Sequence, residues 1–219
     1  MFGKKLPAAV LWDMDGTLVD SEEYWLSSEQ NLAKEFNGSW DAQDGLDLIG
    51  MSLYDSSQVM KDKMGLDLEP EEIIQRLTDD VVAQLTVSIP WRPGARELLL
   101  ELKKRGVKTA LVTMSMKRMA DSVAAQIPFK AFDVIVAGDM VTHGKPHPEP
   151  YLLAATMLGV KPEDCVAFED SNTGLTSAEA AGTKAIGITN IVPITLRPGR
   201  TIWPTLEGVT LKDLRKLFK

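Results

Sequence analysis

Short apolar runs separated by longer amphipathic stretches make up most of the chain. Five runs predict strands: AAVLWDM (8–14), VKTALVTM (107–114), FDVIVAGD (132–139), CVAFED (165–170) and KAIGIT (184–189). None alternates cleanly between apolar and polar residues, as expected for strands that are covered on both faces. The pattern therefore predicts a buried, parallel sheet.

Helical periodicity fills the intervals between these strands. The stretch GARELLLELKKRG (94–106) carries Leu98, Leu99 and Leu102 on one face, has basic residues in its last turn and ends at Gly106. SMKRMADSVAAQI (115–127) and HPEPYLLAATMLGV (147–160) follow the second and third strands. This alternation predicts an α/β fold with a doubly wound, Rossmann-like parallel sheet.

One region interrupts the alternation directly after the first strand. Residues 17–88 contain no convincing strand, and three stretches read as helices: SEEYWLSSEQNLAKEF (21–36), SLYDSSQVMKDKM (52–64) and EPEEIIQRLTDDVVAQL (69–85). We therefore predict an α/β core domain of residues 1–16 and 89–219 and a helical cap domain of residues 17–88. After the fifth strand we predict a proline-rich loop and a short terminal helix, LKDLRKLF (211–218).

Composition and charge exclude several classes of protein. The chain has 219 residues, 44% hydrophobic and 25% charged, and its net charge of −7 argues against a general nucleic-acid binder. No apolar stretch approaches the roughly 18 residues of a membrane span, and we read the N-terminal segment as part of the fold, not as a signal peptide. The only cysteine, Cys165, is predicted to be a small buried strand residue. We predict a cytoplasmic monomer.

Polar residues stand where the predicted strands end. In a doubly wound sheet, ligands bind outside the carboxyl ends of the strands. Any one such residue has an ordinary structural explanation, such as helix capping or solvation in a loop, but their repetition at successive strands indicates a site. The residues are Asp13, Asp15, Thr113, Ser115, Lys145, Glu169 and Asp170.

The order and spacing of these residues resemble a known family. DMDGT (13–17), LVTMS (111–115), GKPHPEPY (144–151) and FEDSNTG (168–174) are similar to the four motifs of the haloacid dehalogenase superfamily, in the branch of the β-phosphoglucomutases and phosphatases with a helical cap. The resemblance covers nearly the whole chain. It implies phosphoryl transfer through an aspartyl-phosphate on a small phosphorylated metabolite, with neither nucleic acid nor a membrane as partner.

The resemblance also implies roles for individual residues. Asp13 is the expected nucleophile, and Asp15 the general acid for the leaving oxygen and then the base for water. Thr113 and Lys145 are expected to hold the phosphoryl group. The expected Mg²⁺ ligands are Asp13, Asp15, Glu169 and Asp170, and the remaining substrate or phosphate contacts are assigned to Met14, Gly16, Trp25, Met114 and Ser115.

The chemistry of the residues supports these roles independently. A carboxylate that attacks a phosphate dianion meets like-charge repulsion, so a divalent cation and a lysine are needed to neutralise the oxygens. Mg²⁺ prefers oxygen ligands, which suits a set of carboxylates without histidine or cysteine. On an extended segment the i, i+2 spacing puts Asp13 and Asp15 on the same side, so that one can attack phosphorus while the other reaches the ester oxygen.

Other reactions of the superfamily fit less well. Dehalogenases lack the second aspartate, which is present here as Asp15. Phosphonoacetaldehyde hydrolases use a Schiff-base lysine from the cap, and none of Lys34, Lys61 and Lys63 lies in an apolar setting that would lower its pKa. A catalytically silent binding protein with this fold is the alternative from another class, but the intact motif residues argue against it.

The main rival is a β-phosphoglucomutase. The Glu-Asp pair in the fourth motif, FEDSNTG, and the segment DSEEY (20–24) resemble that branch. However, Trp25 stands where the mutases carry a cap histidine, and Leu53 stands where they carry an arginine. Residues 17–88 hold 16 Asp or Glu against 4 Lys or Arg, a net charge of −12, and the remainder is +5. A cap with so few cations is poorly suited to a second anion. We therefore favour a phosphatase acting on a sugar or polyol phosphate.

Two histidines flank the predicted phosphate-binding lysine. His143 and His147 lie in a proline-rich loop around Lys145 with no acid between them. Mg²⁺ does not favour imidazole ligands. We predict that they shape the loop or the rim of the phosphate site.

Overall fold

The protein forms a six-stranded parallel sheet. The computed structural model describes residues 5–218, so residues 1–4 and 219 of the predicted core domain lie outside the described part. The strands are β1 (Ala9–Trp12), β2 (Lys108–Val112), β3 (Val134–Val136), β4 (Cys165–Glu169), β5 (Lys184–Ile188) and β6 (Thr201–Trp203). Their order is β3-β2-β1-β4-β5-β6, and all paired strands are parallel. The predicted α/β fold class is confirmed.

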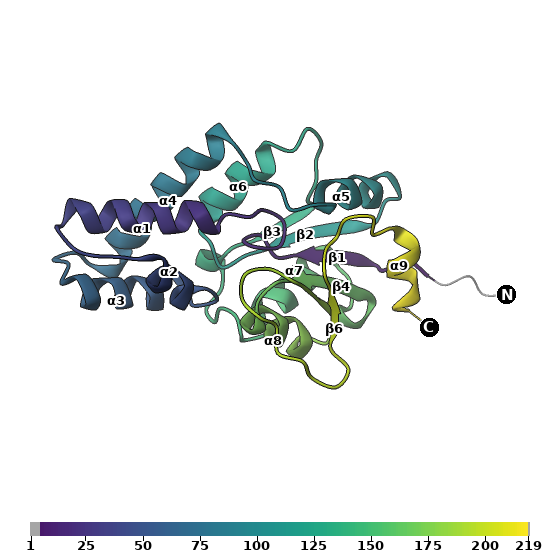
Figure 1. Ribbon diagram of the computed structural model, residues 1–219. Coiled ribbons are helices and arrows are strands. Elements are labelled where there is room, and N and C mark those ends of the chain that lie inside the picture. Colours follow the sequence, from purple (N-terminus) through teal and green to yellow (C-terminus); the bar gives the residue numbers. More distant parts are fainter. Residues whose placement is uncertain (1–4, 219) are drawn as a thin grey trace.

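Helices cover both faces of the sheet (Figure 1). One face packs against α5 (Ala95–Lys104), α6 (Lys117–Ala125) and α9 (Leu211–Lys216), and the other against α7 (Glu149–Leu158) and α8 (Asn172–Ala180). Two 3₁₀ turns, η1 (Gly138–Met140) and η2 (Pro162–Asp164), complete the connections. In β1, Val10 and Trp12 join the first cluster while Ala9 and Leu11 join the second, all fully buried. Burial on both faces explains why this strand sequence does not alternate.

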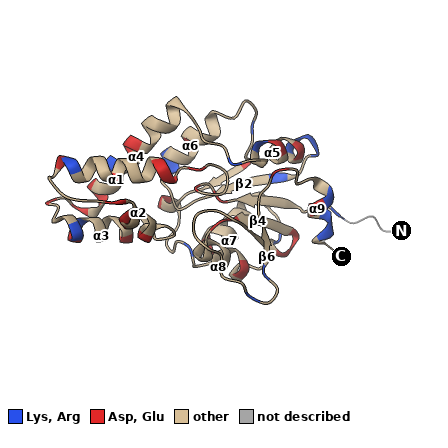
Figure 2. Cartoon of the chain, in the orientation of Figure 1, with Lys and Arg blue, Asp and Glu red and all other residues tan. Residues whose placement is uncertain are grey.

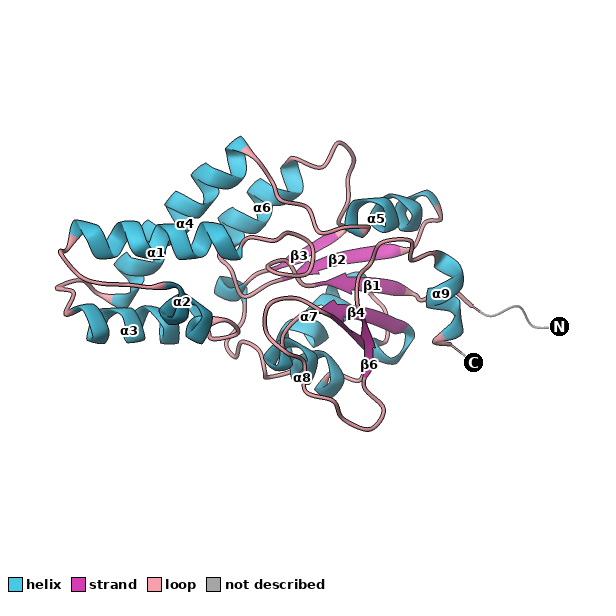
Figure 3. Ribbon diagram, viewed as in Figure 1, coloured by secondary structure: helices cyan, strands magenta, loops and turns pink. Residues whose placement is uncertain are grey.

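Four helices follow β1 before the alternation of strand and helix begins. They are α1 (Glu22–Glu35), α2 (Ala42–Leu48), α3 (Leu53–Met64) and α4 (Pro70–Val87), and Figure 3 shows only helices and loops in this part. They enclose an apolar cluster of their own that includes Leu32, Met60 and Ile73. They lie beyond the carboxyl ends of the strands, at the end of the molecule opposite α9 (Figure 1). We call residues 22–87 the helical insert; that they form a separate cap domain stays a prediction.

The two segments that connect the insert to the core pair with each other in antiparallel orientation. Val19 forms an isolated bridge with Trp91, and the Asp20 N–H donates to the Pro90 carbonyl at 2.7 Å. A further contact runs between helices, because Arg118 of α6 pairs with Asp79 of α4. The insert is therefore held directly over the ends of β1 and β2.

The structure contains elements that the pattern did not predict. α2 has only seven residues with Gly45 among them, and its start depends on a capping box between Asp41 and Asp44. α8 follows the fourth strand without a clear apolar stripe. β6 is three half-buried residues in the predicted proline-rich loop, and it exists because it pairs with β5 at the sheet edge. The terminal helix α9 and the buried Cys165 are confirmed. Across residues 5–218, the helices are all too short or too polar to span a bilayer.

Candidate active site

The ends of three neighbouring strands carry the predicted motif residues. β1 ends at Trp12, β2 at Val112 and β4 at Glu169, and these strands are adjacent and parallel. Their following residues therefore meet at one edge of the sheet. The chain turns back after β1 at Gly16, whose φ is +77° and whose N–H donates to the Val19 carbonyl at 2.7 Å. A side chain at Gly16 would collide with the Asp170 carboxylate, so this turn requires glycine.

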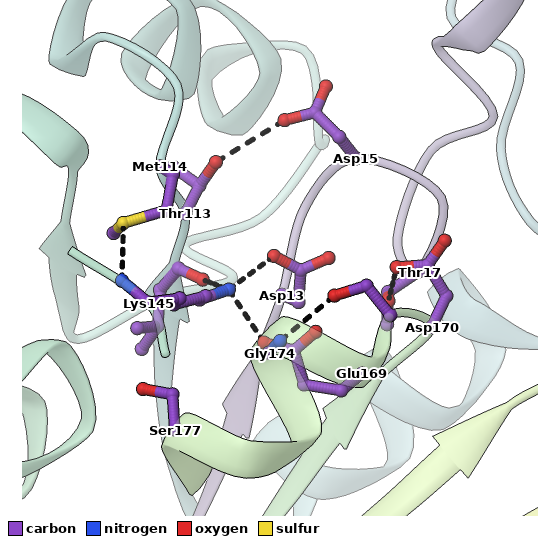
Figure 4. A network of polar contacts seen from close by, with 12 residues as sticks. Asp13, Asp15, Thr17, Thr113, Met114, Lys145, Glu169, Asp170, Gly174 and Ser177 are labelled. Atoms are coloured by element: carbon purple, nitrogen blue, oxygen red, sulfur yellow. Dashed lines mark hydrogen bonds and ion pairs between the residues drawn. The ribbon is translucent and has the colours of Figure 1, made fainter. Parts of the chain in front are cut away.

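Lys145 lies at the centre of the carboxylates. Its Nζ is 2.6 Å from Asp13 Oδ1 and 2.6 Å from Glu169 Oε1, and it donates to the Val112 carbonyl at 2.9 Å (Figure 4). Burial alone would lower the pKa of Lys145, but the charges and hydrogen bonds of Asp13 and Glu169 outweigh it and hold the pKa above its usual value. The lysine is therefore a fixed, buried cation beside Asp13.

The three buried carboxyl groups have raised pKa values. Burial, followed by repulsion from Glu169, raises the pKa of Asp13 to about 7. Burial, followed by repulsion from Asp13, raises the pKa of Asp170 to about 7, although Asn190 Nδ2 donates to it at 3.1 Å. Burial also raises the pKa of Glu169, which accepts a hydrogen bond from the Tyr151 hydroxyl. One buried ammonium thus does not fully compensate these carboxylates.

The same three carboxylates fit a hard divalent cation. Asp13, Glu169 and Asp170 each offer one oxygen, and these oxygens all lie within 4.8 Å of one another. The group has oxygen donors alone, the set that Mg²⁺ prefers, and a bound cation would relieve the repulsion that raises their pKa values. Asp15, which was predicted as a fourth ligand, does not contribute its side chain to this group.

Asp15 has partners of its own. Its Oδ2 accepts from Ser115 Oγ at 2.7 Å and Thr113 Oγ1 at 3.3 Å, while Oδ1 accepts from Ser21 Oγ at 2.6 Å and Trp25 Nε1 at 3.2 Å. Figure 4 shows its carboxylate turned toward Thr113, whereas that of Asp13 faces Lys145. Because β1 ends at Trp12 and the chain turns at Gly16, Asp13 and Asp15 do not lie on one extended strand, contrary to the prediction from their i, i+2 spacing.

A cavity opens between these residues and the insert. The core contributes Asp13, Asp15, Thr113, Met114, Ser115, Lys145, Asp170, Ser171, Thr173 and Gly174. The insert contributes Glu22, Trp25, Glu29, Gly45, Leu48, Ile49, Gly50, Met51, Leu53, Ser56 and Leu77. Lys145 is the one lysine or arginine in this lining as far as residues 5–218 are concerned. On the core side of the cavity the Lys145 ammonium therefore lies among the carboxylates of Asp13, Asp15 and Asp170, and the insert contributes an acidic and apolar wall.

The predicted substrate-binding residues differ in where they lie. Trp25, Met114 and Ser115 line the cavity, and Met114 Sδ accepts a hydrogen bond from the Lys145 N–H. Met14 is fully buried with its side chain in the apolar core, so its side chain does not reach the cavity. Gly16 forms the turn described above and is also absent from the lining.

Several residues at the site were not predicted. Ser21 holds Asp15, Tyr151 holds Glu169 and Asn190 holds Asp170. Ser21 and Tyr151 stand inside the quoted segments DSEEY and GKPHPEPY, so their hydroxyls were a readable signal. Glu22 and Glu29 of the cavity wall gave no signal, because acids are frequent throughout the insert.

The histidines beside Lys145 form an exposed group with Glu149. One ligand atom from each of His143, His147 and Glu149 lies within 4.8 Å of the others. The Glu149 carboxylate accepts the N–H groups of Thr142 at 2.8 Å and His143 at 3.0 Å, and these backbone hydrogen bonds lower its pKa. Glu149 thus closes the loop that carries Lys145.

Comparison with known proteins gives one consistent family. A family model for haloacid dehalogenase-like hydrolases matches residues 7–182. A phosphorylated carbohydrates phosphatase of Thermotoga maritima is 31% identical over 81% of this chain and 83% of its own, and a fructose-1-phosphate phosphatase of Escherichia coli is 30% identical over 83% and 96%. The crystal structure of CbbY from Rhodobacter sphaeroides with xylulose-1,5-bisphosphate superposes with a TM-score of 0.87, at 27% identity over 95% of this chain and 99% of that one. The chain belongs to the haloacid dehalogenase-like hydrolases.

Proposed function

We propose that this protein is a Mg²⁺-dependent phosphatase that hydrolyses a small sugar or polyol phosphate through an aspartyl-phosphate on Asp13. The observation that carries the proposal is the environment of Asp13. Its carboxylate is buried, is paired with the Lys145 ammonium at 2.6 Å and faces a cavity lined by a second aspartate. A nucleophile, a phosphate-binding cation and a proton carrier are thus gathered around one space.

The residues divide the reaction between them. The Asp13 carboxylate attacks phosphorus, the bond to the ester oxygen breaks, and the departing oxygen takes a proton from Asp15. Asp15, now ionised, removes a proton from water, which attacks the phosphorus of the aspartyl-phosphate and releases inorganic phosphate and free Asp13. Both half-reactions thus balance with one proton carried by Asp15.

The remaining groups bind charge. Lys145 and the Thr113 hydroxyl are positioned beside Asp13 and Asp15 to hold phosphoryl oxygens. Asp13, Glu169 and Asp170 would hold Mg²⁺, which when bound neutralises the phosphoryl oxygens and the carboxylates around them. Without this charge the approach of Asp13 to a phosphate dianion would be repulsive.

The leaving group is proposed to be neutral. Lys145, the one cation in the described cavity lining, is already committed to the phosphoryl site. The insert presents Glu22 and Glu29, and Leu53 occupies the position where the mutases carry arginine. The two relatives named above as phosphatases act on phosphorylated carbohydrates, which supports the same class for this chain.

The decisive experiment is phosphate release from a panel of phosphomonoesters in the presence of Mg²⁺. We expect hydrolysis of hexose and hexitol monophosphates, and loss of activity when a chelator removes divalent cations. Full activity in excess chelator would refute the proposed metal dependence. Absence of phosphate release from every ester would refute the phosphatase assignment and revive the alternative of a silent binding protein.

A further inference from the structure

Two acids of α1 line the cavity without a cationic partner. Glu29 is 6% exposed, and its Oε2 accepts from the Trp40 indole N–H at 2.8 Å, while Oε1 has no donor from the described residues. Glu22, about two helical turns nearer the sheet, is partly exposed, and its side chain has neither a hydrogen bond nor an ion pair within residues 5–218. A helical residue and one seven positions later lie on the same face, so both acids face the cavity from one side.

The cations of the insert are engaged elsewhere. Lys61 pairs with Glu69 at 3.1 Å, Lys63 pairs with Asp44, and Arg76 pairs with Glu35 at 2.7 Å. These three side chains, like the exposed Lys34, are outside the cavity lining. Within residues 5–218, the lysines and arginines of the insert therefore place no positive charge in the cavity lining beside these two acids.

Desolvated carboxylate oxygens need hydrogen-bond donors. Burial raises the pKa of Glu29 to about 7 and that of Glu22 to about 8, so the protein itself does not satisfy their charged forms. When a ligand displaces water from the cavity, an acceptor that stays unpaired costs the full desolvation penalty. A leaving group that carries hydrogen-bond donors would satisfy the oxygens that lack a partner among residues 5–218.

The rest of the wall indicates which donors these are. Trp25, Leu48 and Leu53 present apolar surface next to the acids, and Ser56 adds a hydroxyl. A surface of apolar groups with a few placed acceptors matches a carbon chain that carries hydroxyl groups, because C–H bonds face the apolar part while O–H bonds point to oxygen. An alkyl ammonium would satisfy the acids but would leave no use for several separate acceptors.

We propose that Glu22 and Glu29 accept hydrogen bonds from hydroxyl groups of the leaving group and thereby select polyhydroxylated phosphate esters. This inference rests on the proposed phosphatase function and adds to it the residues that read the substrate. Glu29, whose carboxylate is held by Trp40, would contact the leaving group further from the sheet, and Glu22 would contact it near Asp15.

The test compares esters of equal chain length. Glucitol 6-phosphate and hexyl phosphate share six carbons and a primary ester, but hexyl phosphate has no hydroxyl groups. The measured quantity is the ratio of their kcat/KM values. Glu29→Gln keeps the shape and an acceptor for the Trp40 N–H, and Glu22→Gln removes a carboxyl group that has no partner among the described residues. We expect each to lower this ratio about tenfold or more, because sites built for hydroxyl groups discriminate strongly.

Controls separate this inference from the function on which it rests. Glu23→Gln changes the same charge on the same helix at an exposed position, and it should leave the ratio as in the wild type. Thermal denaturation shows whether Glu29→Gln is folded, and Glu22→Gln serves as the independent second variant. Equal losses on both esters, or an unchanged ratio in both folded variants, would overturn the inference while leaving the phosphatase intact.

A third ester tests the charge of the ligand. If 6-aminohexyl phosphate were the better substrate and its advantage disappeared in the two variants, the acids would bind an ammonium group and the hydroxyl assignment would be wrong. If the wild type hydrolysed none of the esters, the proposed phosphatase function itself would fail and this inference with it.

Discussion

Asp13 and Asp15 are two residues apart and have different environments. Asp13 pairs with Lys145 and joins the carboxylate group suited to Mg²⁺, whereas Asp15 accepts four hydrogen bonds from hydroxyl and indole groups. Two of its donors, Thr113 and Ser115, follow β2, and two, Ser21 and Trp25, lie at and just inside the start of α1. All four donors are neutral groups, and within residues 5–218 no ion pair involves Asp15, which is the proposed proton carrier of the reaction.

Substitution of each aspartate should have a different consequence. Asp13→Asn removes the nucleophile, so turnover and any phosphoenzyme should vanish. Asp15→Asn removes the proton carrier, so hydrolysis of hexitol phosphate should fall by about 10²–10⁴-fold, while an activated aryl phosphate, whose leaving group needs no proton, should still phosphorylate Asp13. Mass spectrometry of the quenched protein measures the phosphoenzyme. Phosphoenzyme in Asp13→Asn would show that another residue is the nucleophile.

Glu22 should make stability depend on pH. Burial and repulsion from Asp15 and Asp170 raise its pKa from 4.5 to about 8 in the folded protein. Between these values the folded state holds more protons than the unfolded state, so the free energy of unfolding contributed by Glu22 is fully present below about pH 4.5 and is lost as the pH rises toward 8.

Urea denaturation in a chelating buffer can isolate this contribution. The glutamine side chain of Glu22→Gln does not titrate. The free energy of unfolding of this variant minus that of the wild type should therefore increase steadily from pH 5 to pH 8. Glu23→Gln, at an exposed position, should differ from the wild type by a constant amount. A constant difference for Glu22→Gln as well would mean that Glu22 keeps an ordinary pKa.

At the scale of elements, α8 begins where β4 delivers its acids. Ser171 caps the helix by accepting the Gly174 N–H at 3.0 Å, and Gly174 lies directly against the Glu169 carboxylate. The first turn of α8 and the end of β4 are therefore packed so closely that only a residue without Cβ fits. This packing fixes the position of Glu169 in the proposed metal site.

Gly174→Ala should stabilise helix α8 but displace the Glu169 carboxylate. Helix propensity favours alanine over glycine by about 1 kcal/mol. The added Cβ, however, would overlap the Glu169 carboxylate, so the carboxylate must move. Because displacement of a catalytic group by about 1 Å can cost about 10²-fold, we expect a loss of activity of that order and a higher Mg²⁺ requirement. Mg²⁺ titration of the activity measures both. Wild-type activity with raised stability would show that Glu169 moves without consequence.

At the scale of the molecule, charge is unevenly distributed. Acidic residues recur along the helices of the insert, with few basic ones among them (Figure 2). Most of these acids are exposed at the surface, and the ion pairs that some of them form, such as Glu69 with Lys61, contribute little to stability. Their combined field nevertheless lies over the one cationic position of the described cavity lining, Lys145.

This field should disfavour a second anion on the substrate. We expect kcat/KM to be higher for hexose monophosphates than for hexose bisphosphates, by about tenfold for about 1.4 kcal/mol of uncompensated repulsion. The gap should narrow as salt is added, because the screening length falls from about 8 Å at physiological ionic strength to about 3 Å at 1 M.

A comparison of two reactions decides between phosphatase and mutase. CbbY, whose fold this chain shares, was crystallised with a sugar bisphosphate, so the fold itself accepts such ligands. We expect hydrolysis of glucose 6-phosphate to exceed interconversion of β-glucose 1-phosphate primed with glucose 1,6-bisphosphate. Efficient primed interconversion would show that the insert does hold a second phosphate.

The sequence by itself determined five of the six strands, the place of the helical insert and which polar residues stand at the strand ends. Strands buried on both faces are continuous apolar runs, and functional side chains follow them directly, so local patterns carry this information. The elements that the sequence pattern did not predict are short. The capping box of α2 and the sheet edge of β6 stabilise segments whose own patterns are too weak to read.

Only the tertiary structure decided how the acids divide. Composition and spacing alone do not separate Asp13 from Asp15, and two of the partners that distinguish them, Thr113 and Lys145, come from segments about a hundred or more residues away. Likewise Glu22 and Glu29 are two acids among the 16 of residues 17–88 until the fold turns them into the cavity. Burial and unpaired charge depend on what surrounds a side chain in space, and therefore arise only when distant segments pack together.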